Sequence, residues 1–341
     1  MTSAPAPRTQ QAIVQTRYGG ARDVLALIKD LPVVPPSAHE VQVQVRASSI
    51  NPIDWHMLEG NRRLITRRRF PFTPMFDLAG VVTAVGSEVT TFSVDDRVYA
   101  DNEIHGGGGT EYVNVPEDLL AHAPAGLGFA ETAAIPLAAQ TALTCLDRGD
   151  ISPGTRIAII GASGGVGHFA VQMARAAGAF VVGVSSARNR DFVLKLGADE
   201  VVDRNETDLT AQYGANSFDV VIDTVGGRNQ WLQARHVLRQ GGRFVTISRD
   251  EDGVVTPAAI VRLLTTITVR RIQGAGKRGI KYIPVFLKAS RSLLRRVTAL
   301  VDNGHVTPHV ARTFPLTLAG LRQGIEESRA GRTAGKLVLE R

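Results

Sequence analysis

A glycine-rich turn between an apolar strand and a helix is the feature that most constrains the fold of this chain. Residues 156–161 form a strand-type run rich in isoleucine, and residues 165–177 have the spacing of a helix. Four glycines mark the change from strand to helix, at positions 161, 164, 165 and 167. Such a turn presents backbone N–H groups at the amino end of a helix, where the partial positive charge favours a pyrophosphate. The segment therefore predicts a strand–turn–helix unit of a parallel sheet that binds a dinucleotide.

The cofactor contacts expected at this turn come from five consecutive residues, Ser163, Gly164, Gly165, Val166 and Gly167. The spacing is G-x-x-G-x-x-G rather than G-x-G-x-x-G, so the motif alone is a weak match and its strand–helix context strengthens it. A tight turn that binds nothing remains the alternative interpretation.

The end of the next strand predicts which dinucleotide binds. A cofactor with a free 2′-hydroxyl is usually held there by an acidic residue, and none is present. Instead, Ser186, Arg188 and Asn189 follow the strand. Hydroxyl and guanidinium groups suit a 2′-phosphate, which a carboxylate would repel. We therefore expect NADPH rather than NADH, with the alternative that Arg188 and Arg190 only flank the start of a helix.

Strand and helix patterns alternate after about residue 128. The expected strands are 156–161, 180–185, 200–203, 219–223, 243–248 and 269–274, and helical segments 165–177, 189–196 and 229–239 fall between most of them. This alternation predicts βαβ units and a doubly wound parallel sheet. The preceding residues look mostly β, with long loops. Helices are expected at 284–303 and 317–330, and a final strand at 336–339 is expected to return to the amino-terminal β region.

Composition limits the other function classes. The chain has 341 residues, a formal net charge of +7 and a pI of about 9.9. This charge is compatible with nucleic acid, an anionic surface or a phosphorylated cofactor, and solvated surface arginines are the favoured interpretation. The one cysteine, Cys145, forms no intramolecular disulfide and no thiolate-rich zinc site, which favours a cytoplasmic location. No apolar run is long enough for a transmembrane helix, and no secretory signal is recognised.

Several further blocks carry a family resemblance: Asn51-Pro-Ile-Asp54, Asp77-Leu-Ala-Gly80, Asp223-Thr-Val-Gly226 and Gly335-Lys336. Together with the glycine turn, they resemble the medium-chain dehydrogenase/reductase superfamily, specifically its zinc-independent quinone oxidoreductase branch. The resemblance implies an α/β fold with three parts: a GroES-like catalytic domain at 1–128, a Rossmann NADP-binding domain at 129–275, and a segment at 276–341 that returns to the catalytic domain.

The resemblance also implies roles for individual residues. It places Asn51 beside the nicotinamide or the substrate and Thr141 on the nicotinamide face. The remaining cofactor contacts expected are Thr224, Val225, Ser248 and Lys336. The alternative interpretation of Asn51 is a turn-forming residue before a proline, and that of Thr141 is a hydroxyl that packs within a helix.

The chemistry expected is hydride transfer without metal. The Gly-His-Glu block of the zinc-dependent relatives does not occur, and without a Lewis acid the acceptor must already be electrophilic, as quinones and α,β-unsaturated carbonyls are. Alternatives are an enoyl-thioester or pathway-specific enone reductase, and a non-catalytic protein that binds NADPH or RNA. A homodimer is expected. Neither a membrane nor a nucleic acid is expected as a partner.

Overall fold

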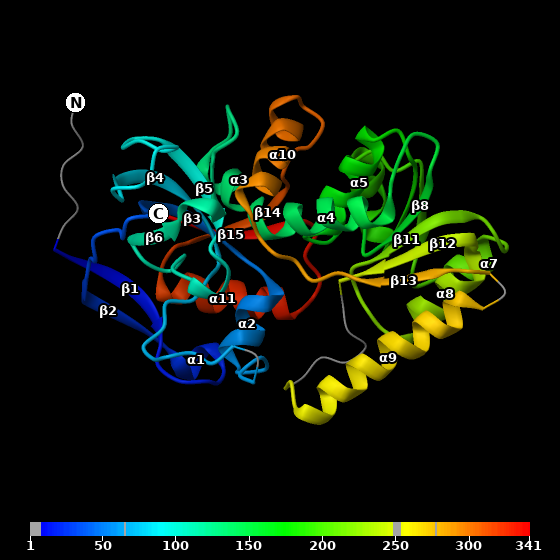
Figure 1. Ribbon diagram of the computed structural model, residues 1–341, viewed down its shortest axis with the longest axis horizontal. Coiled ribbons are helices and arrows are strands. Elements are labelled where there is room, and N and C mark those ends of the chain that lie inside the picture. The colour runs from blue at the N-terminus through cyan, green and yellow to red at the C-terminus, as the bar shows by residue number, and fades with distance from the viewer. Residues whose placement is uncertain (1–7, 65, 248–253, 277) are drawn as a thin grey trace. The chain divides into compact units, whose positions relative to one another are not determined.

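The computed structural model describes residues 8–64, 66–247, 254–276 and 278–341, which form two units (Figure 1). The amino-terminal unit contains the described residues up to Gln140, Lys288–Gly304 and Pro308–Arg341. The central unit contains Thr141–Leu287 and His305–Thr307. Helix α4 (Pro136–Gly149) begins in the amino-terminal unit and ends in the central unit. The division at residues 128 and 275 remains a sequence-based prediction beside these bounds.

The amino-terminal unit is built on a seven-stranded sheet. Six of its strands follow the order β14-β15-β3-β4-β5-β7, and β6 pairs with β3. Their bounds are β3 (Glu40–Ile50), β4 (Asp77–Val85), β5 (Arg97–Asp101), β6 (Tyr112–Pro116), β7 (Leu120–His122), β14 (Val310–Pro315) and β15 (Lys336–Glu340). A separate hairpin pairs β1 (Thr9–Gln15) with β2 (Leu25–Pro32). The helices are α1 (Ala21–Val24), α2 (Pro52–Leu58), α3 (Phe129–Ala133), α10 (Arg291–Asp302) and α11 (Leu318–Arg329), with short 3-10 helices η1 (Glu103–His105) and η2 (Glu117–Leu119).

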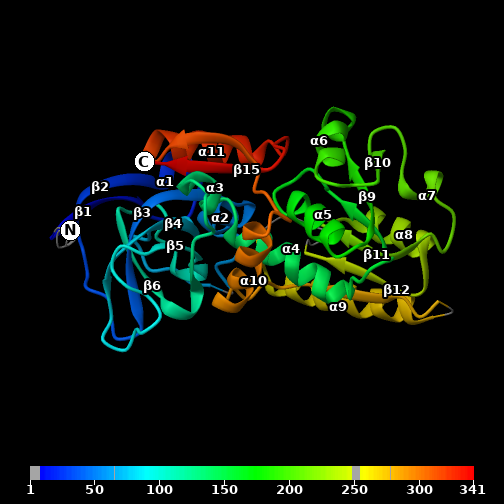
Figure 2. The same cartoon turned by 90° about the horizontal axis from the view of Figure 1, so that it is seen from above.

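The last strand completes the amino-terminal sheet. Strand β15 runs antiparallel to β3, with Leu337 opposite Ile50 and Glu340 opposite Ala47. Figure 2 shows β15 and α11 in red beside the blue β3. Leu337 and Leu339 are buried in the same apolar core as the valines of β3, and this burial favours the pairing. The expectation that the carboxyl end returns to the amino-terminal β region is confirmed.

The central unit contains a six-stranded, fully parallel sheet in the order β10-β9-β8-β11-β12-β13. The strands are β8 (Arg156–Ile160), β9 (Phe180–Ser185), β10 (Glu200–Asp203), β11 (Phe218–Asp223), β12 (Leu238–Thr246) and β13 (Lys281–Pro284). The helices are α5 (Gly167–Ala176), α6 (Arg190–Lys195), α7 (Leu209–Gln212), α8 (Arg228–Val237) and α9 (Pro257–Ala275), with the 3-10 helix η3 (Ala187–Asn189). The order reverses direction between β8 and β11, and ligands of such sheets bind at the carboxyl ends of the strands at this point.

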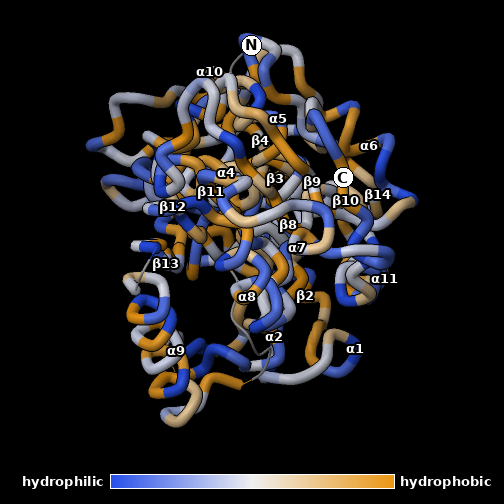
Figure 3. Tube along the Cα trace, turned by 90° about the vertical axis from the view of Figure 1, so that its right-hand side faces the viewer, coloured by the Kyte–Doolittle hydropathy of each residue, from blue (hydrophilic) through white to orange (hydrophobic). Residues whose placement is uncertain are grey.

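The prediction of a strand at residues 269–274 is wrong, because these residues belong to helix α9. Their Val and Ile content favours a strand, but the helix has a strong start: Pro257 occupies its first turn, and the Thr256 hydroxyl accepts a hydrogen bond from Ala259 N at 3.0 Å. Figure 3 shows apolar and polar residues alternating along α9. The sixth strand of the sheet is instead β13, and the helix expected at 284–303 is shorter, because α10 begins only at Arg291.

Two arginines, one within α9 and one after it, have local structural partners. Buried Arg270 donates from Nη1 to the Tyr282 hydroxyl at 3.1 Å. Arg278 donates to the carbonyls of Arg235 and His236 at 3.1 and 2.9 Å. These two arginines therefore tie α9, α8 and β13 together. Within the described ranges, no helix is long and apolar enough to cross a membrane.

Candidate active site

The glycine turn joins β8 to α5 and can be built only with glycines at two of its positions. Gly161 has a φ of +81°, which favours glycine. A Cβ on Gly167 would lie 2.1 Å from the Gly161 carbonyl oxygen and 2.8 Å from Ala162 Cα. The turn therefore brings backbone against backbone at the start of a ten-residue helix whose N-cap, Val166, makes no side-chain hydrogen bond. This is the arrangement that leaves helix N–H groups for an anion.

Two predicted cofactor residues meet beside this turn. Asn189 Nδ2, in η3 after β9, donates to Ser163 Oγ at 2.9 Å. Ser186, which precedes η3, is half-buried, and Arg188 within η3 is exposed. Arg190 has a structural contact, because its Nη1 donates to the Val201 carbonyl at 2.9 Å. Hydroxyl, amide and guanidinium groups thus gather after β9, and no carboxylate stands at positions 186–190.

The end of β11 borders the same turn. Thr224 Oγ1 donates to the Ile160 carbonyl at 2.8 Å, which ties the carboxyl ends of β11 and β8 together. Asp223 Oδ1 accepts the N–H groups of Val225 and Gly226 at 3.0 and 2.9 Å, and burial raises the pKa of this carboxyl. Val225 is 49% exposed, so its side chain is accessible to a ligand. Ser248, the other residue expected near here, lies outside the described residues.

A dinucleotide fits these residues of the central unit. The cradle at Gly161–Gly167 has no room for side chains at Gly161 or Gly167, since a Cβ on Gly161 would lie 2.4 Å from Thr224 Oγ1. Its donors are backbone N–H groups, and its polar side chains carry no negative charge. A pyrophosphate matches that donor set, and a 2′-phosphate matches Ser186, Arg188 and Asn189.

The second set of candidate residues lies in the amino-terminal unit, around Asn51. Asn51 follows β3 and precedes α2, whose first residue is Pro52. The Asp54 carboxylate accepts the Asn51 backbone N–H at 2.7 Å, and Asp54 N donates to the Asn51 carbonyl at 3.0 Å. The Asn51 side chain also accepts from the Asp54 backbone N–H, which completes a capping box. The Asn-Pro-x-Asp sequence therefore starts the helix, as the turn-forming interpretation requires. These contacts leave the side-chain N–H groups of Asn51 for other partners.

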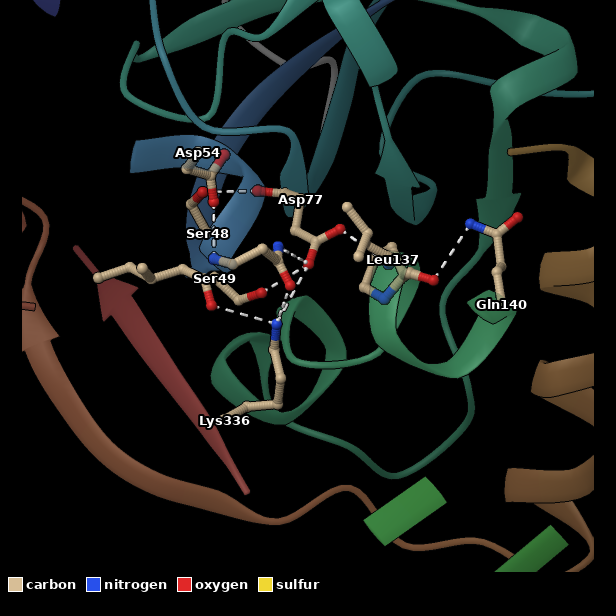
Figure 4. A network of polar contacts seen from close by, with 10 residues as sticks. Ser48, Ser49, Asp54, Asp77, Leu137, Gln140 and Lys336 are labelled. Carbon is tan, nitrogen blue, oxygen red and sulfur yellow. Dashed lines mark hydrogen bonds and ion pairs between the residues drawn. The ribbon is translucent and has the colours of Figure 1, made fainter. Parts of the chain in front are cut away.

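The Asn51 side chain contacts Asp77 and Lys336, which Figure 4 labels within a buried polar network. Its Nδ2 donates to Asp77 Oδ2 at 2.8 Å, and Lys336 Nζ donates to its Oδ1 at 2.5 Å. Lys336 also donates to the Ile50 carbonyl at 3.3 Å and lies 3.6 Å from Asp77 Oδ2. Asn51, Asp77 and Lys336 are 2%, 0% and 3% exposed. The network joins the end of β3, the start of β4 and the start of β15.

Asp77 is the centre of this network. Besides Asn51 and Lys336, its carboxylate accepts the Ser49 hydroxyl at 2.6 Å and the backbone N–H of Leu137 at 2.9 Å. Leu137 stands in the first turn of α4, whose next turn carries Thr141. Thr141 is itself 6% exposed. The sequence predicts Lys336 as a cofactor contact and gives Asp77 only as part of a family block; here Lys336 contacts Asn51 and Asp77. The signal that could have linked them is that Asp77 and Lys336 each begin an otherwise apolar strand.

Two further buried carboxyls surround the network. Burial raises the pKa of Asp54 to about 7, and its Oδ1 is buried with no hydrogen-bond partner in the described chain. Asp101 stands opposite Asp77 across the β4–β5 pair, and burial raises its pKa as well. Burial lowers the pKa of Lys336, while Asp77 and Asp54 oppose that effect. Three buried carboxyls therefore share one buried ammonium, which favours a protonated, neutral Asp54 below pH 7.

Asp54 predicts a pH dependence of stability. A carboxyl whose pKa is raised in the folded protein stabilises the fold while protonated, and this stabilisation is lost as the pH rises from about 4 to 7. We expect Asp54→Asn, which stays neutral, to raise the free energy of unfolding by roughly 2–4 kcal/mol at pH 8 relative to wild type and by less at pH 5. Urea unfolding at both pH values measures this. Asp30→Asn, on the exposed part of β2, is the matched control, and equal effects of Asp54→Asn at both pH values contradict the assignment.

The comparisons with known proteins agree with this geometry. Residues 37–125 match the alcohol dehydrogenase GroES-like domain, and residues 196–339 match a family described as zinc-binding dehydrogenase. A chloroplast envelope quinone oxidoreductase homolog of Arabidopsis thaliana is 33% identical over 98% of this chain and 99% of its own. The chain belongs to the medium-chain dehydrogenase/reductase superfamily, in its quinone oxidoreductase branch.

Two other members of the superfamily are similar over nearly the whole chain. The 2-methylene-furan-3-one reductase of Solanum lycopersicum is 31% identical over 99% of this chain and 81% of its own. The structure of Escherichia coli quinone oxidoreductase complexed with NADPH superposes with a TM-score of 0.80 at 27% identity, covering 97% of this chain and all of that one. The α/β fold with GroES-like and Rossmann parts is thus confirmed. The family name mentions zinc, but the described ranges contain no group of three or more His, Cys, Asp or Glu residues placed to hold a metal.

Proposed function

We propose that this member of the superfamily is a zinc-independent, NADPH-dependent reductase of quinones or α,β-unsaturated carbonyls. The observation that carries the proposal is the junction of the glycine turn with η3, where Asn189 meets Ser163 and guanidinium and hydroxyl groups replace the acid typical of NAD sites. The names of the similar proteins support it: two are quinone oxidoreductases, one in complex with NADPH, and the third reduces a ketone conjugated to a methylene group.

When bound, NADPH supplies a hydride; the acceptor gains that hydride and one proton, and NADP⁺ remains. The backbone at Ser163, Gly164, Gly165, Val166 and Gly167 would hold the pyrophosphate. Ser186, Arg188 and Asn189 would hold the 2′-phosphate, while Thr224 and Val225 would line the cofactor at the end of β11. Asn51 and Thr141 are the proposed catalytic residues: the Asn51 amide would donate to the acceptor oxygen, on which negative charge grows as the hydride arrives, and Thr141 would line the nicotinamide face.

A substrate panel tests the proposed function. NADPH oxidation would be followed with a simple quinone, an alkenone, a saturated aldehyde and an enoyl thioester. We expect turnover of the quinone or the alkenone and little of the aldehyde, because an unconjugated carbonyl needs activation. Preference for the enoyl thioester would support the alternative thioester reductase. No NADPH oxidation with any acceptor would contradict a catalytic role and leave a cofactor-binding protein.

Arg188 predicts the cofactor preference. We expect Arg188→Ala to raise the KM for NADPH by about 10- to 100-fold, because a charge-assisted hydrogen bond to a phosphate is lost, and to change the KM for NADH by less than about twofold. Steady-state kinetics with both cofactors measures this. Arg190→Ala is the matched control, since it removes the same charge from a guanidinium that faces the Val201 carbonyl. Equal effects of Arg188→Ala on both cofactors would contradict the assignment.

We also propose a homodimer formed through the central unit. Strand β13 is the outer strand of its sheet, and the neighbouring α9 has large aliphatic side chains exposed to solvent: Ile260, Val261, Leu264, Val269 and Ile272. An unpaired strand edge beside exposed apolar surface favours pairing with a second copy. Sedimentation equilibrium tests this: a dimer that Ile272→Asp dissociates is expected, and a wild-type monomer at micromolar concentration would contradict it. A cytoplasmic location is proposed from the single, buried thiol of Cys145.

A further inference from the structure

The buried ammonium of Lys336 has no role in the proposed function so far. An ammonium at 3% exposure costs free energy unless its partners compensate, and its partners are the Asn51 side chain, the Ile50 carbonyl and Asp77. Replacing a whole buried ion pair by apolar side chains is often neutral or stabilising, so filling the core does not by itself require Lys336 and Asp77. The site therefore uses the charge or the donor groups of Lys336.

The network fixes the orientation of the Asn51 amide. An ammonium can only donate, so the atom at 2.5 Å from Lys336 Nζ is the amide oxygen. The amide nitrogen then faces Asp77 Oδ2, to which it donates at 2.8 Å. One of the two N–H groups of Asn51 Nδ2 is thereby used, and the other has no acceptor among the described residues. Lys336 and Asp77, which we call the clamp, thus leave one side-chain N–H of Asn51 as a donor and fix its direction.

We propose that Lys336 and Asp77 are positioning residues, which hold the Asn51 amide so that its remaining N–H donates to the oxygen of the acceptor. This inference rests on the proposed function, because it assigns the partner of that N–H. The two residues hold opposite ends of one amide, on strands that reach the site from opposite ends of the sequence. Neither needs to touch the substrate or the cofactor.

The charge of Lys336 strengthens the donor as well as placing it. Hydrogen bonds in series polarise one another, so an ammonium on the amide oxygen makes the amide nitrogen a better donor. The same positive charge favours negative charge on an acceptor oxygen bound to that nitrogen. The Asp77 carboxylate, which accepts from the same nitrogen, opposes this effect. The ammonium therefore offsets the charge of Asp77 at the step in which the acceptor oxygen becomes negative, and it acts through the amide.

A double-substitution cycle tests the proposal. Lys336→Met removes the charge and the donor, whereas Lys336→Gln retains a neutral donor; Asn51→Ala removes the amide. We expect Lys336→Met to lower kcat with a quinone by about 10- to 100-fold at nearly constant KM, and Lys336→Gln to lower it less. Adding Lys336→Met to Asn51→Ala should cause no further loss, because both act through one group. Lys29→Met, on the exposed part of β2, is the control with unchanged kcat.

Two readouts without turnover complete the test. In the free protein, the ¹⁵N side-chain amide signal of Asn51, assigned by its loss in Asn51→Ala, should move in Lys336→Met and stay in Lys29→Met. The Kd for NADPH should change by less than about twofold in Lys336→Met, because Lys336 contacts Asn51 rather than the cofactor. Lys336→Gln provides the same comparison if Lys336→Met does not fold.

The outcomes separate this inference from the proposed function. Losses that multiply in the double variant, or an Asn51 signal that ignores Lys336, overturn the positioning role. A Kd for NADPH raised tenfold or more also overturns it and assigns Lys336 to the cofactor. If wild type reduces no quinone or alkenone, the proposed function fails, while the Asn51 signal still reports whether the clamp exists.

Discussion

Replacing Gly167 by alanine is expected to raise the Kd for NADPH by about 100-fold, the largest single effect on binding that the structure predicts. The added Cβ would stand 2.1 Å from the Gly161 carbonyl oxygen, and backbone atoms on that side cannot rotate away as a side chain would. The turn must therefore shift, and the N–H groups at the start of α5 move with it. Isothermal titration calorimetry measures the loss.

Gly214→Ala is the matched control for this experiment. Gly214 belongs to the same unit, and a Cβ there meets no atom within 4 Å. The Gly214→Ala variant should bind NADPH with the Kd of wild type. Its far-ultraviolet circular dichroism spectrum and that of Gly167→Ala should be the same. Unchanged NADPH affinity in a folded Gly167→Ala variant would show that the pyrophosphate does not lie on this turn.

Asp77→Ala is expected to produce the largest loss of stability. It would leave the ammonium of Lys336 buried without its counter-charge, and the Ser49 hydroxyl and Leu137 N–H without their acceptor. Breaking a buried pair by removing one partner costs about 3–5 kcal/mol. Urea unfolding measures the change in the free energy of unfolding, with the hydrogen exchange of the β3 and β4 amides as the readout for the amino-terminal unit.

The matched comparisons for Asp77 are Asp77→Asn and Asp30→Ala. Asp77→Asn retains an acceptor and should lose less stability, whereas Asp30→Ala removes an exposed carboxylate and should lose almost none. A loss below about 1 kcal/mol in Asp77→Ala would mean that Lys336 does not depend on this carboxylate in the folded protein.

The sequence predicted those parts of the fold that depend on local pattern. The turn at 161–167 follows from glycines between a strand and a helix, and the return of the last strand follows from an apolar run after the final helix. Residues 269–274 were misread because β-branched residues favour a strand locally, while the cap that starts α9 lies thirteen residues earlier, at Thr256. The local preference of residues 269–274 for a strand cannot show that the helix started at Thr256 continues through them.

The candidate site was predictable one residue at a time but not as a network. Asn51 precedes a proline and a helix, so its position was readable from its neighbours. Its partners Asp77 and Lys336 lie 26 and 285 residues away in the sequence, and only the pairing of β3 with β4 and β15 brings them together. Asp77 and Leu137 are also far apart in the sequence, so the hydrogen bond between the Asp77 carboxylate and the first turn of α4 could not be predicted from the residues of the helix.

Deuterium transfer from NADPH labelled at C4 of the nicotinamide shows whether this protein reduces a conjugated acceptor. With an alkenone as acceptor, and with each of the two C4 positions labelled in turn, mass spectrometry and NMR locate the label in the product. We expect a saturated ketone carrying one deuterium at the carbon β to the carbonyl, from one of the two labelled cofactors. Deuterium at the carbonyl carbon of an alcohol, or no transfer to any conjugated acceptor, would contradict the proposed function.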